Sequence, residues 1–150
     1  MNCLRHVVTS DVELVYKWSN DPLVRCQSFS TQNIGWHEHI KWFEEILKKE
    51  NVLFYILSVN NQDVGQIRLN LKDGKAIISY SISSMYRNKG YGELILRLGE
   101  KQLFNLHGNK YVLEAEVKIS NTVSHKLFKK LKYKLCESNE RYVVYRKKLD

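Results

Sequence analysis

The chain has 150 residues, 43% of them hydrophobic and 27% charged, and its formal net charge is +8. This length suits one domain over residues 1–150 and leaves no room for a second domain of ordinary size. With no apolar run of about 18 residues and no cationic start followed by an apolar stretch, neither a membrane span nor a secretion signal is predicted, and we expect a cytoplasmic protein.

The positive charge and the cysteines narrow the function further. An excess of positive charge indicates an anionic partner, which can be nucleic acid, a membrane surface or a phosphate-rich small molecule. The cysteines, Cys3, Cys26 and Cys136, are odd in number and widely spaced. This pattern predicts neither a disulfide framework nor a metal site, and we interpret all of them as reduced structural thiols.

The N-terminal stretch predicts a strand followed by a helix. Residues 4–8 are strand-like, and Ser10 or Asp11 is the expected N-cap of the helix. This helix should end by Asn20, because Pro22 disfavours helical geometry in the residue before it.

A second helix and three strands come next. The helix is expected over residues 35–49, where apolar side chains recur at spacings of three and four: Trp36, Ile40, Phe43 and Leu47. Strand-like runs occupy 51–60, 62–71 and 75–83 and are separated by turn residues. They predict an antiparallel meander.

In the second half of the chain the hydrophobic period changes to that of a helix. An apolar stripe made of Leu94, Ile95, Leu98, Gly99, Leu103 and Leu106 predicts a helix that stops near Gly108. A strand over 110–117, a helix over 120–131, a strand-like piece near Leu135 and a strand over 141–149 follow. The element order predicts an α/β fold with a mixed, mostly antiparallel sheet flanked by helices.

The stretch "YRNKGYGELIL" joins the third meander strand to this helix. A helix that begins just after Gly90 offers unpaired amides and a positive dipole end, while Gly90 and Gly92 let an anion approach the main chain. Arg87 and Lys89 add full positive charges. The pattern is neither a Walker A loop nor a dinucleotide fingerprint. The alternative is a basic turn whose glycines only shape the start of the helix.

With its flanks, this stretch resembles a known family. "ISYSISSMYRNKGYGELIL" resembles the acetyl-CoA-binding segment of the GCN5-related N-acetyltransferases (GNAT), whose signature is Arg/Gln-x-x-Gly-x-Gly/Ala. "AEVKISNTVSHKLFKKLKY" resembles a later segment of that family, and Asn121 and Ser124 fall on its Asn-x-x-Ala/Ser positions. The resemblance implies a single GNAT-like domain that uses acetyl-CoA and no metal.

The resemblance also implies a set of coenzyme-binding residues. The loop that would hold the pyrophosphate consists of Arg87, Asn88, Lys89, Gly90, Tyr91 and Gly92. The strand end that would pair with the pantetheine arm consists of Ser81, Ile82 and Ser83. Asn121 and Ser124 would contact the same arm or the adjacent phosphates.

The N-terminal part resembles a branch of the family through "WSNDPLVR" and the spacing around His39. That branch acetylates nucleotide-linked amino sugars, of the pseudaminic acid or spore-coat polysaccharide type, or ribosomal-protein N-termini. The resemblance implies a small-molecule amine acceptor, with His39 as an acceptor-binding residue. Asn20, Asp21 and Arg25 are further acceptor-binding candidates, and we expect a monomer or a homodimer. For Arg25 the guanidinium fork suits phosphate; the alternative for Asn20 and Asp21 is turn chemistry around Pro22.

Acetyl transfer to an amine requires a base that removes a proton. Glu114 and Glu116 share one face of the strand over 110–117, and Glu116 is the better candidate because it lies nearer the segment that resembles the cleft. The alternative is a solvated or salt-bridged face. His39 is the second catalytic candidate, with an exposed helical histidine as its alternative, and we expect His37 to face solvent.

Two positions depart from the family pattern. Phe128 stands where many members have a tyrosine that acts as general acid, so water, Ser124 or Tyr133 would have to supply that proton. Lys132 stands where the family has a glycine, and a positive φ there would be costly for lysine.

Three functions follow from these patterns. The first is an N-acetyltransferase that acts on a nucleotide-linked amino sugar, and the second is an acetyltransferase of protein N-termini. The third is a nucleic-acid-binding module that uses the lysine-dense C-terminal part: Lys126, Lys129, Lys130, Lys132, Lys134, Arg146, Lys147 and Lys148.

Overall fold

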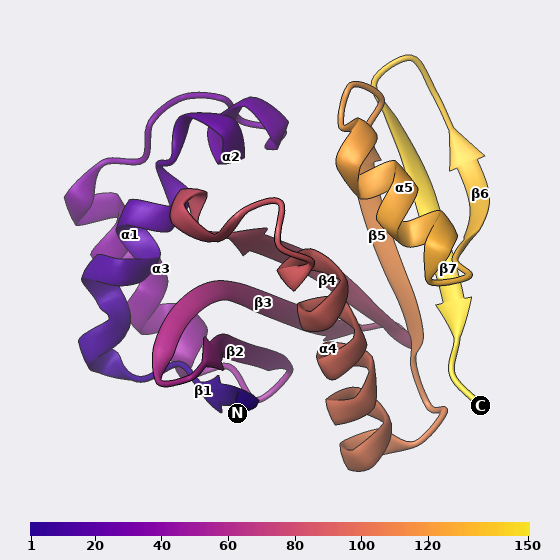
Figure 1. Cartoon of the computed structure of the whole chain (residues 1–150), viewed down its shortest axis with the longest axis horizontal. Helices are drawn as coiled ribbons and strands as arrows, with labels where there is room; N and C mark the ends of the chain where they lie inside the picture. Colours follow the sequence, from indigo (N-terminus) through magenta and orange to yellow (C-terminus); the bar gives the residue numbers. More distant parts are fainter.

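A computed structural model describes residues 1–150 as one seven-stranded sheet with strand order β1-β2-β3-β4-β5-β7-β6 (Figure 1). In chain order the elements are β1 (Asn2–His6), a 3-10 turn (Thr9–Asp11), α1 (Val12–Ser19), α2 (Pro22–Gln27), α3 (Trp36–Leu47), β2 (Val52–Val59), β3 (Gln62–Lys72), β4 (Lys75–Ile82), a 3-10 turn (Ser84–Tyr86), α4 (Tyr91–His107), β5 (Val112–Lys118), α5 (Thr122–Lys130), β6 (Lys134–Ser138) and β7 (Tyr142–Lys148). Only the β4–β5 pair is parallel. The predicted mixed, mostly antiparallel sheet is confirmed.

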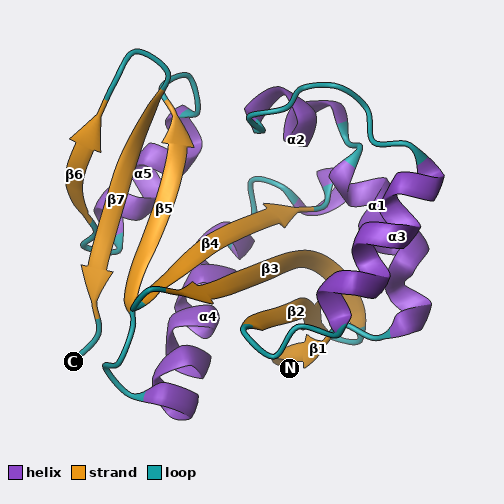
Figure 2. Ribbon diagram, turned by 180° about the vertical axis from the view of Figure 1, so that it is seen from behind, coloured by secondary structure: helices purple, strands orange, loops and turns teal.

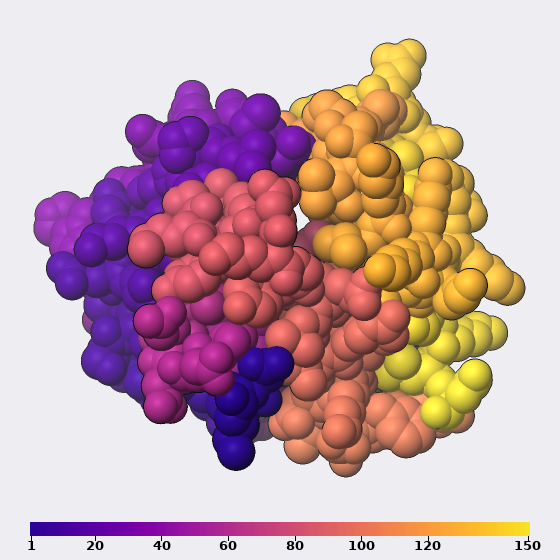
Figure 3. Space-filling view, viewed as in Figure 1, coloured from indigo at the N-terminus to yellow at the C-terminus, as the bar shows by residue number.

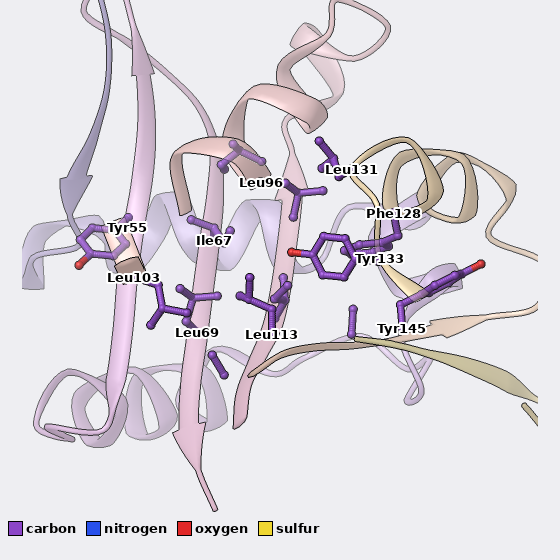
Figure 4. Packing of buried hydrophobic residues seen from close by; sticks show 14 of the residues in the cluster. Tyr55, Ile67, Leu69, Leu96, Leu103, Leu113, Phe128, Leu131, Tyr133 and Tyr145 are labelled. Carbon is purple, nitrogen blue, oxygen red and sulfur yellow. The ribbon is translucent and has the colours of Figure 1, made fainter. Parts of the chain in front are cut away.

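Helices cover both faces of the sheet (Figures 1 and 2). One face packs α4 and α5 into the main core, in which the labelled side chains Leu96 and Leu103 lie beside Ile67, Leu69 and Leu113 (Figure 4). The other face carries α1 and α3 over a smaller core, which includes Val15, Trp18, Phe43, Phe54 and Ile56. Strand β2 therefore buries alternate residues on opposite faces, as a central strand does.

At the N-terminus one boundary differs from the prediction. The first strand begins earlier than predicted, at Asn2, because it pairs with β2 from Asn2 opposite Val59 to His6 opposite Tyr55. Asp11 is the N-cap residue of α1, as predicted, but its carboxylate makes no capping hydrogen bond to α1 and accepts instead from the Arg5 guanidinium at 2.9 Å. This ion pair holds the pKa of Asp11 below its ordinary value.

Helix α2 was not predicted. It has six residues and no apolar period, and it begins where the Asp21 carboxylate accepts from the amides of Leu23 and Val24, with Pro22 in the first turn. The turn chemistry expected around Pro22 is therefore the start of a short helix. Its importance is its position, because α2 reaches across the molecule toward β5 (Figure 1).

The sheet opens between its two parallel strands. Pairing of β4 with β5 ends at Ile77 opposite Glu114, although β4 continues to Ile82 and β5 to Lys118 (Figure 2). Beyond that point the facing edges of the two strands have no ladder partner. The space-filling view shows a hollow between the segment that leads into α4 and the C-terminal part of the chain (Figure 3).

Lys132 occupies a left-handed position after α5, with φ of +71°. The Lys132 amide donates to the Lys129 carbonyl at 3.1 Å and the Tyr133 amide to the Phe128 carbonyl at 2.9 Å, which is a Schellman motif that favours glycine. The conformational cost suspected from the sequence is thus present.

We expect Lys132→Gly to raise the free energy of unfolding. Relief of left-handed strain of about 1–2 kcal/mol exceeds the extra chain entropy that glycine loses, about 0.5–1 kcal/mol. The melting temperature should rise by about 2–4 °C per kcal/mol gained. The matched control is Lys129→Gly inside α5, which should lower it. A fall for Lys132→Gly as well would contradict the strain.

Candidate active site

The opening between β4 and β5 is the floor of a cleft of about 1080 Å³. Its walls come from β4, β5, α5 and the first turn of α4 on one side, and from α2, α3, β2 and β3 on the other. The α2 segment forms a roof, since the Lys118 ammonium donates to the Cys26 carbonyl at 3.1 Å and the Phe29 ring meets Tyr142 edge to face. The cleft is thus covered on one side by α2 and the loop that follows it.

The start of α4 is built to receive an anion. Gly90 is the N-cap, with φ of +83°, and no side chain caps the first amides of this 17-residue helix. Those amides have no intrahelical acceptor, and the helix dipole adds positive potential. The Glu93 carboxylate is drawn aside by Lys130 and Arg97, which hold its pKa below the ordinary value. The start of α4 therefore has the geometry that the predicted anion site requires.

Nine of the eleven predicted coenzyme-binding residues line the cleft: Ser81, Ile82, Arg87, Asn88, Gly90, Tyr91, Gly92, Asn121 and Ser124. The structure does not bring Ser83 and Lys89 into this lining. The Ser83 amide donates to the Val64 carbonyl at 2.8 Å, and Ser83 borders a smaller adjoining cavity. Lys89 is exposed. Their predicted contacts with the coenzyme stay predictions.

The cleft fits the shape and chemistry of acetyl-CoA. A methyl group at Gly92 would lie 2.9 Å from Leu127 Cδ1 and 4.0 Å from Tyr80 Cε2, so the absent side chain is what keeps this channel open. The free edge of β4 beyond Ile77 can hydrogen-bond an extended amide-bearing arm, and the α4 amides can hold a pyrophosphate. Acetyl-CoA would supply the activated acetyl group. No cluster of His, Cys, Asp or Glu is arranged to hold a metal ion.

Arg87 links the coenzyme loop to the roof. Its guanidinium donates to the Asp21 carboxylate at 2.9 Å, the same carboxylate that caps α2. Burial alone would raise the pKa of Asp21, but the Arg87 charge and the capping amides hold it below the ordinary value. Asp21 therefore connects the start of α2 to the coenzyme loop.

Asn20 and Arg25 also hold the roof in place. The Asn20 side chain exchanges two hydrogen bonds with the Ile34 backbone, at 2.9 and 2.7 Å. The Arg25 guanidinium donates to the carbonyls of Ser19, Ser30 and Gln32. Through these contacts Asn20 and Arg25 hold the loop over 28–34 in place. Arg25 also lines the cleft, and acceptor binding by these residues stays a prediction.

The two glutamates of β5 have different surroundings. Glu114 is buried and pairs with Arg146 at 2.8 Å and with Lys75 at 3.4 Å, as the salt-bridge alternative expected. Glu116 is exposed and lines the cleft. Position along the opening decides this difference, because Glu114 lies where β4 and β5 still pair and Glu116 lies beyond it. Only Glu116 can meet a bound acceptor.

Tyr80 was missed by the sequence reading. It lies on β4, lines the cleft and makes a 2.7 Å hydrogen bond through its phenol to the Ser124 hydroxyl. Burial raises the pKa of Tyr80, so the phenol keeps its proton. Phe128 packs edge to face against Tyr80. The Tyr133 hydroxyl donates to the Glu100 carboxylate at 2.7 Å, and Tyr133 does not line the cleft. The sequence feature that points to Tyr80 is its place near the end of β4, the strand that leads into the glycine loop.

His39 is not the exposed histidine of the alternative interpretation. It is 1% exposed, and its Nε2 lies 2.9 Å from the Val12 carbonyl, to which it donates. Aromatic rings surround it, and it still borders the cleft. Burial lowers the pKa of His39 and outweighs the opposing effect of the Val12 carbonyl. This geometry describes a neutral histidine that joins α3 to α1. His37 is exposed, as predicted.

We expect stability to fall as the pH drops below about 6.5, the ordinary histidine value. The folded state keeps His39 neutral while the unfolded state gains the proton, so the free energy of unfolding decreases toward acid by at most about 1.4 kcal/mol per pH unit. Urea unfolding between pH 7.5 and 5 measures the slope. It should flatten in His39→Phe but not in His37→Gln, which removes an exposed imidazole; an unchanged slope in His39→Phe would contradict the assignment.

Comparisons with known proteins agree with this geometry. A family model described as an acetyltransferase (GNAT) domain matches residues 3–134. A domain from Methanocaldococcus jannaschii is 24% identical and superposes with a TM-score of 0.85 over 99% of both chains. Spermidine N-acetyltransferase from Vibrio cholerae, solved with CoA and spermine, is 13% identical, with a TM-score of 0.83 over 97% of this chain and 92% of that one.

A ribosomal-protein alpha-N-acetyltransferase in complex with coenzyme A is 15% identical, with a TM-score of 0.82 over 99% of this chain and 94% of that one. Likeness at these identities establishes the fold and no acceptor. No curated protein matches the sequence. The family match confirms the predicted enzyme class over the nucleic-acid-binding alternative: the chain belongs to the GNAT family and is an acetyl-CoA-dependent N-acetyltransferase.

Proposed function

We propose that the enzyme acetylates the primary amine of a nucleotide-linked amino sugar. The observation that carries this proposal is the composition of the acceptor half of the cleft, by which we mean the residues from α2, α3, β2, β3 and the loop over 28–34. Arg68, whose guanidinium makes no ion pair, lies there together with the aromatic rings of Phe29, Trp42 and Phe54. A nucleotide-linked sugar carries phosphates that pair with guanidinium groups and a base that stacks on aromatic rings.

In this proposal Glu116 acts as the base. An alkyl ammonium group has a pKa of about 10 and must lose its proton before it attacks a thioester. Glu116 is the exposed carboxylate on the opened edge of β5, within the cleft that both substrates share. It can take that proton directly or through water.

The Tyr80–Ser124 pair takes the place of the family tyrosine as proton donor in this proposal. Phe128 has no proton to give, but it packs against Tyr80, whose phenol is hydrogen-bonded to Ser124 beside the glycine loop. A protonated phenol in a buried setting can donate to a departing thiolate.

Cytoplasmic location also stays a prediction. None of the helices combines the length and the apolar character that a membrane span requires.

A panel of amine acceptors tests the proposed function. The enzyme with acetyl-CoA is offered a UDP-linked 4-amino sugar, a short peptide with a free N-terminus, and spermidine, and release of the coenzyme thiol is recorded. We expect turnover with the UDP-linked sugar and a kcat/KM at least tenfold above the other two. Turnover of the peptide or spermidine alone would replace this acceptor while leaving the enzyme class intact.

A further inference from the structure

Arg68 is a largely buried arginine in the acceptor half of the cleft. It lies on β3, where its register neighbours are Phe54 on β2 and Ser79 on β4. Its guanidinium carbon is 5.0 Å from the centre of the Trp42 ring and 5.7 Å from that of Phe54. Two aromatic rings therefore hold the charged group at the cleft wall.

No protein group neutralises Arg68. Apart from the exposed Arg141, the other arginines donate to a carboxylate or to backbone carbonyls: Arg5, Arg25, Arg87, Arg97 and Arg146. The Arg68 guanidinium has neither an ion pair nor a hydrogen bond within the chain. Burial lowers the pKa of Arg68, and no carboxylate opposes that effect. A buried cation in this state is costly unless an anion meets it.

The donors of Arg68 are available to a ligand. A cation–π contact engages the guanidinium through its charge and leaves its N–H groups free. Gln27 Oε1 is the one buried side-chain polar atom without a hydrogen-bond partner, so no partnerless Arg68 nitrogen is sealed inside the protein. Because Arg68 lines the cleft, its accessible nitrogens open there.

We propose that Arg68 binds an anionic group of the acceptor, a phosphate or carboxylate, and thereby selects acceptors that carry negative charge. This inference deepens the proposed function and rests on it for the identity of the acceptor. The aromatic rings orient the guanidinium fork, which can then bind two oxygens of the anion together. A polycationic amine would meet repulsion at the same place.

Matched acceptor pairs test this selection. The first pair is the UDP-linked amino sugar and the same free sugar; the second is a short peptide with an aspartate or an asparagine after its N-terminal residue. We expect Arg68→Gln to raise KM for the anionic member by about 10- to 100-fold and to leave the neutral member unchanged. Arg68→Lys should fall between, since it keeps the charge and loses the fork. Arg141→Gln, an exposed arginine outside the cleft, is the control.

A binding measurement covers the case in which a variant turns over poorly. With acetyl-CoA held at saturation to fill the α4 site, inorganic pyrophosphate is titrated into wild type and Arg68→Gln while tryptophan fluorescence is followed. We expect quenching in wild type, since Trp42 contacts Arg68, and at least tenfold weaker binding in the variant. If Arg68→Gln does not fold, pyrophosphate is tested as an inhibitor of the wild type. Inhibition that is competitive with the acceptor supports the proposal, and its absence contradicts it.

The outcomes separate the two proposals. If an anionic peptide is acetylated and the UDP-linked sugar is not, the proposed acceptor fails, whereas loss of anion preference in Arg68→Gln still supports Arg68. The inference is overturned if Arg68→Gln raises KM equally for both members of a pair, or if pyrophosphate binding does not depend on Arg68. Arg68 would then be a packing residue.

Discussion

Gly92→Trp is expected to abolish acetyl-CoA binding while the protein still folds. A side chain at position 92 projects between Leu127 and Tyr80, 2.9 and 4.0 Å from its first carbon, into the channel beside the α4 amides. Acetyl-CoA at about 100 times its dissociation constant should stabilise the wild type by about 2.7 kcal/mol, which corresponds to a rise in melting temperature of about 5–10 °C. The variant should show no such rise.

Two substitutions make this result specific. The methyl group of Gly92→Ala meets only the flexible end of the Leu127 side chain. This variant should therefore fold, and its coenzyme binding should be weakened much less than that of Gly92→Trp. Gly35→Trp inserts the same side chain into open space at the start of α3, outside the cleft lining, and should retain the thermal shift. A full shift in Gly92→Trp would place the coenzyme elsewhere on the molecule.

Glu116→Gln is expected to lower kcat by about 10²- to 10⁴-fold without changing acetyl-CoA binding. The amide keeps the size of the carboxylate but cannot accept the amine proton, and general-base catalysis contributes a factor of this order. Because more of the amine is already neutral at high pH, the deficit should shrink as kcat/KM is measured from pH 6.5 to 9.5. A deficit that stays constant over this range would show that Glu116 has another role.

Two other glutamates separate catalysis from stability. Glu45→Gln changes an exposed residue of α3 that makes no ion pair, and its kcat should equal that of the wild type. Glu114→Gln breaks the buried pairs with Arg146 and Lys75 and should lower the melting temperature while leaving kcat unchanged well below that temperature. The two β5 glutamates would thus give opposite signatures.

Much of the site was predictable from neighbouring residues in the sequence. The α4 start at Gly90 depends on a glycine that adopts φ of +83° and on the apolar period that follows it. The end of α5 is equally local, since the left-handed turn at Lys132 is formed by amides only a few residues from their acceptors. Such features depend on interactions within one or two helical turns, which a sequence pattern records.

Burial and distant contacts could not be predicted in this way. His39 and Glu114 occupy positions whose periodicity allowed exposure, and the packing of α3 on α1 and the pairing of β5 with β7 buried them. Helix α2 was missed because six residues carry no usable period, although Asp21 and Pro22 begin it by ordinary capping.

The mixed α/β fold, the start of α4 after Gly90 and the family could all be predicted from local patterns in the sequence. Only the folded chain brings together side chains that are distant in the sequence, since Tyr80 hydrogen-bonds Ser124 across 44 residues and Arg87 pairs with Asp21 across 66. It also left Arg68 with two aromatic rings and no carboxylate. These contacts depend on packing between elements far apart in the chain, which a local sequence pattern does not record.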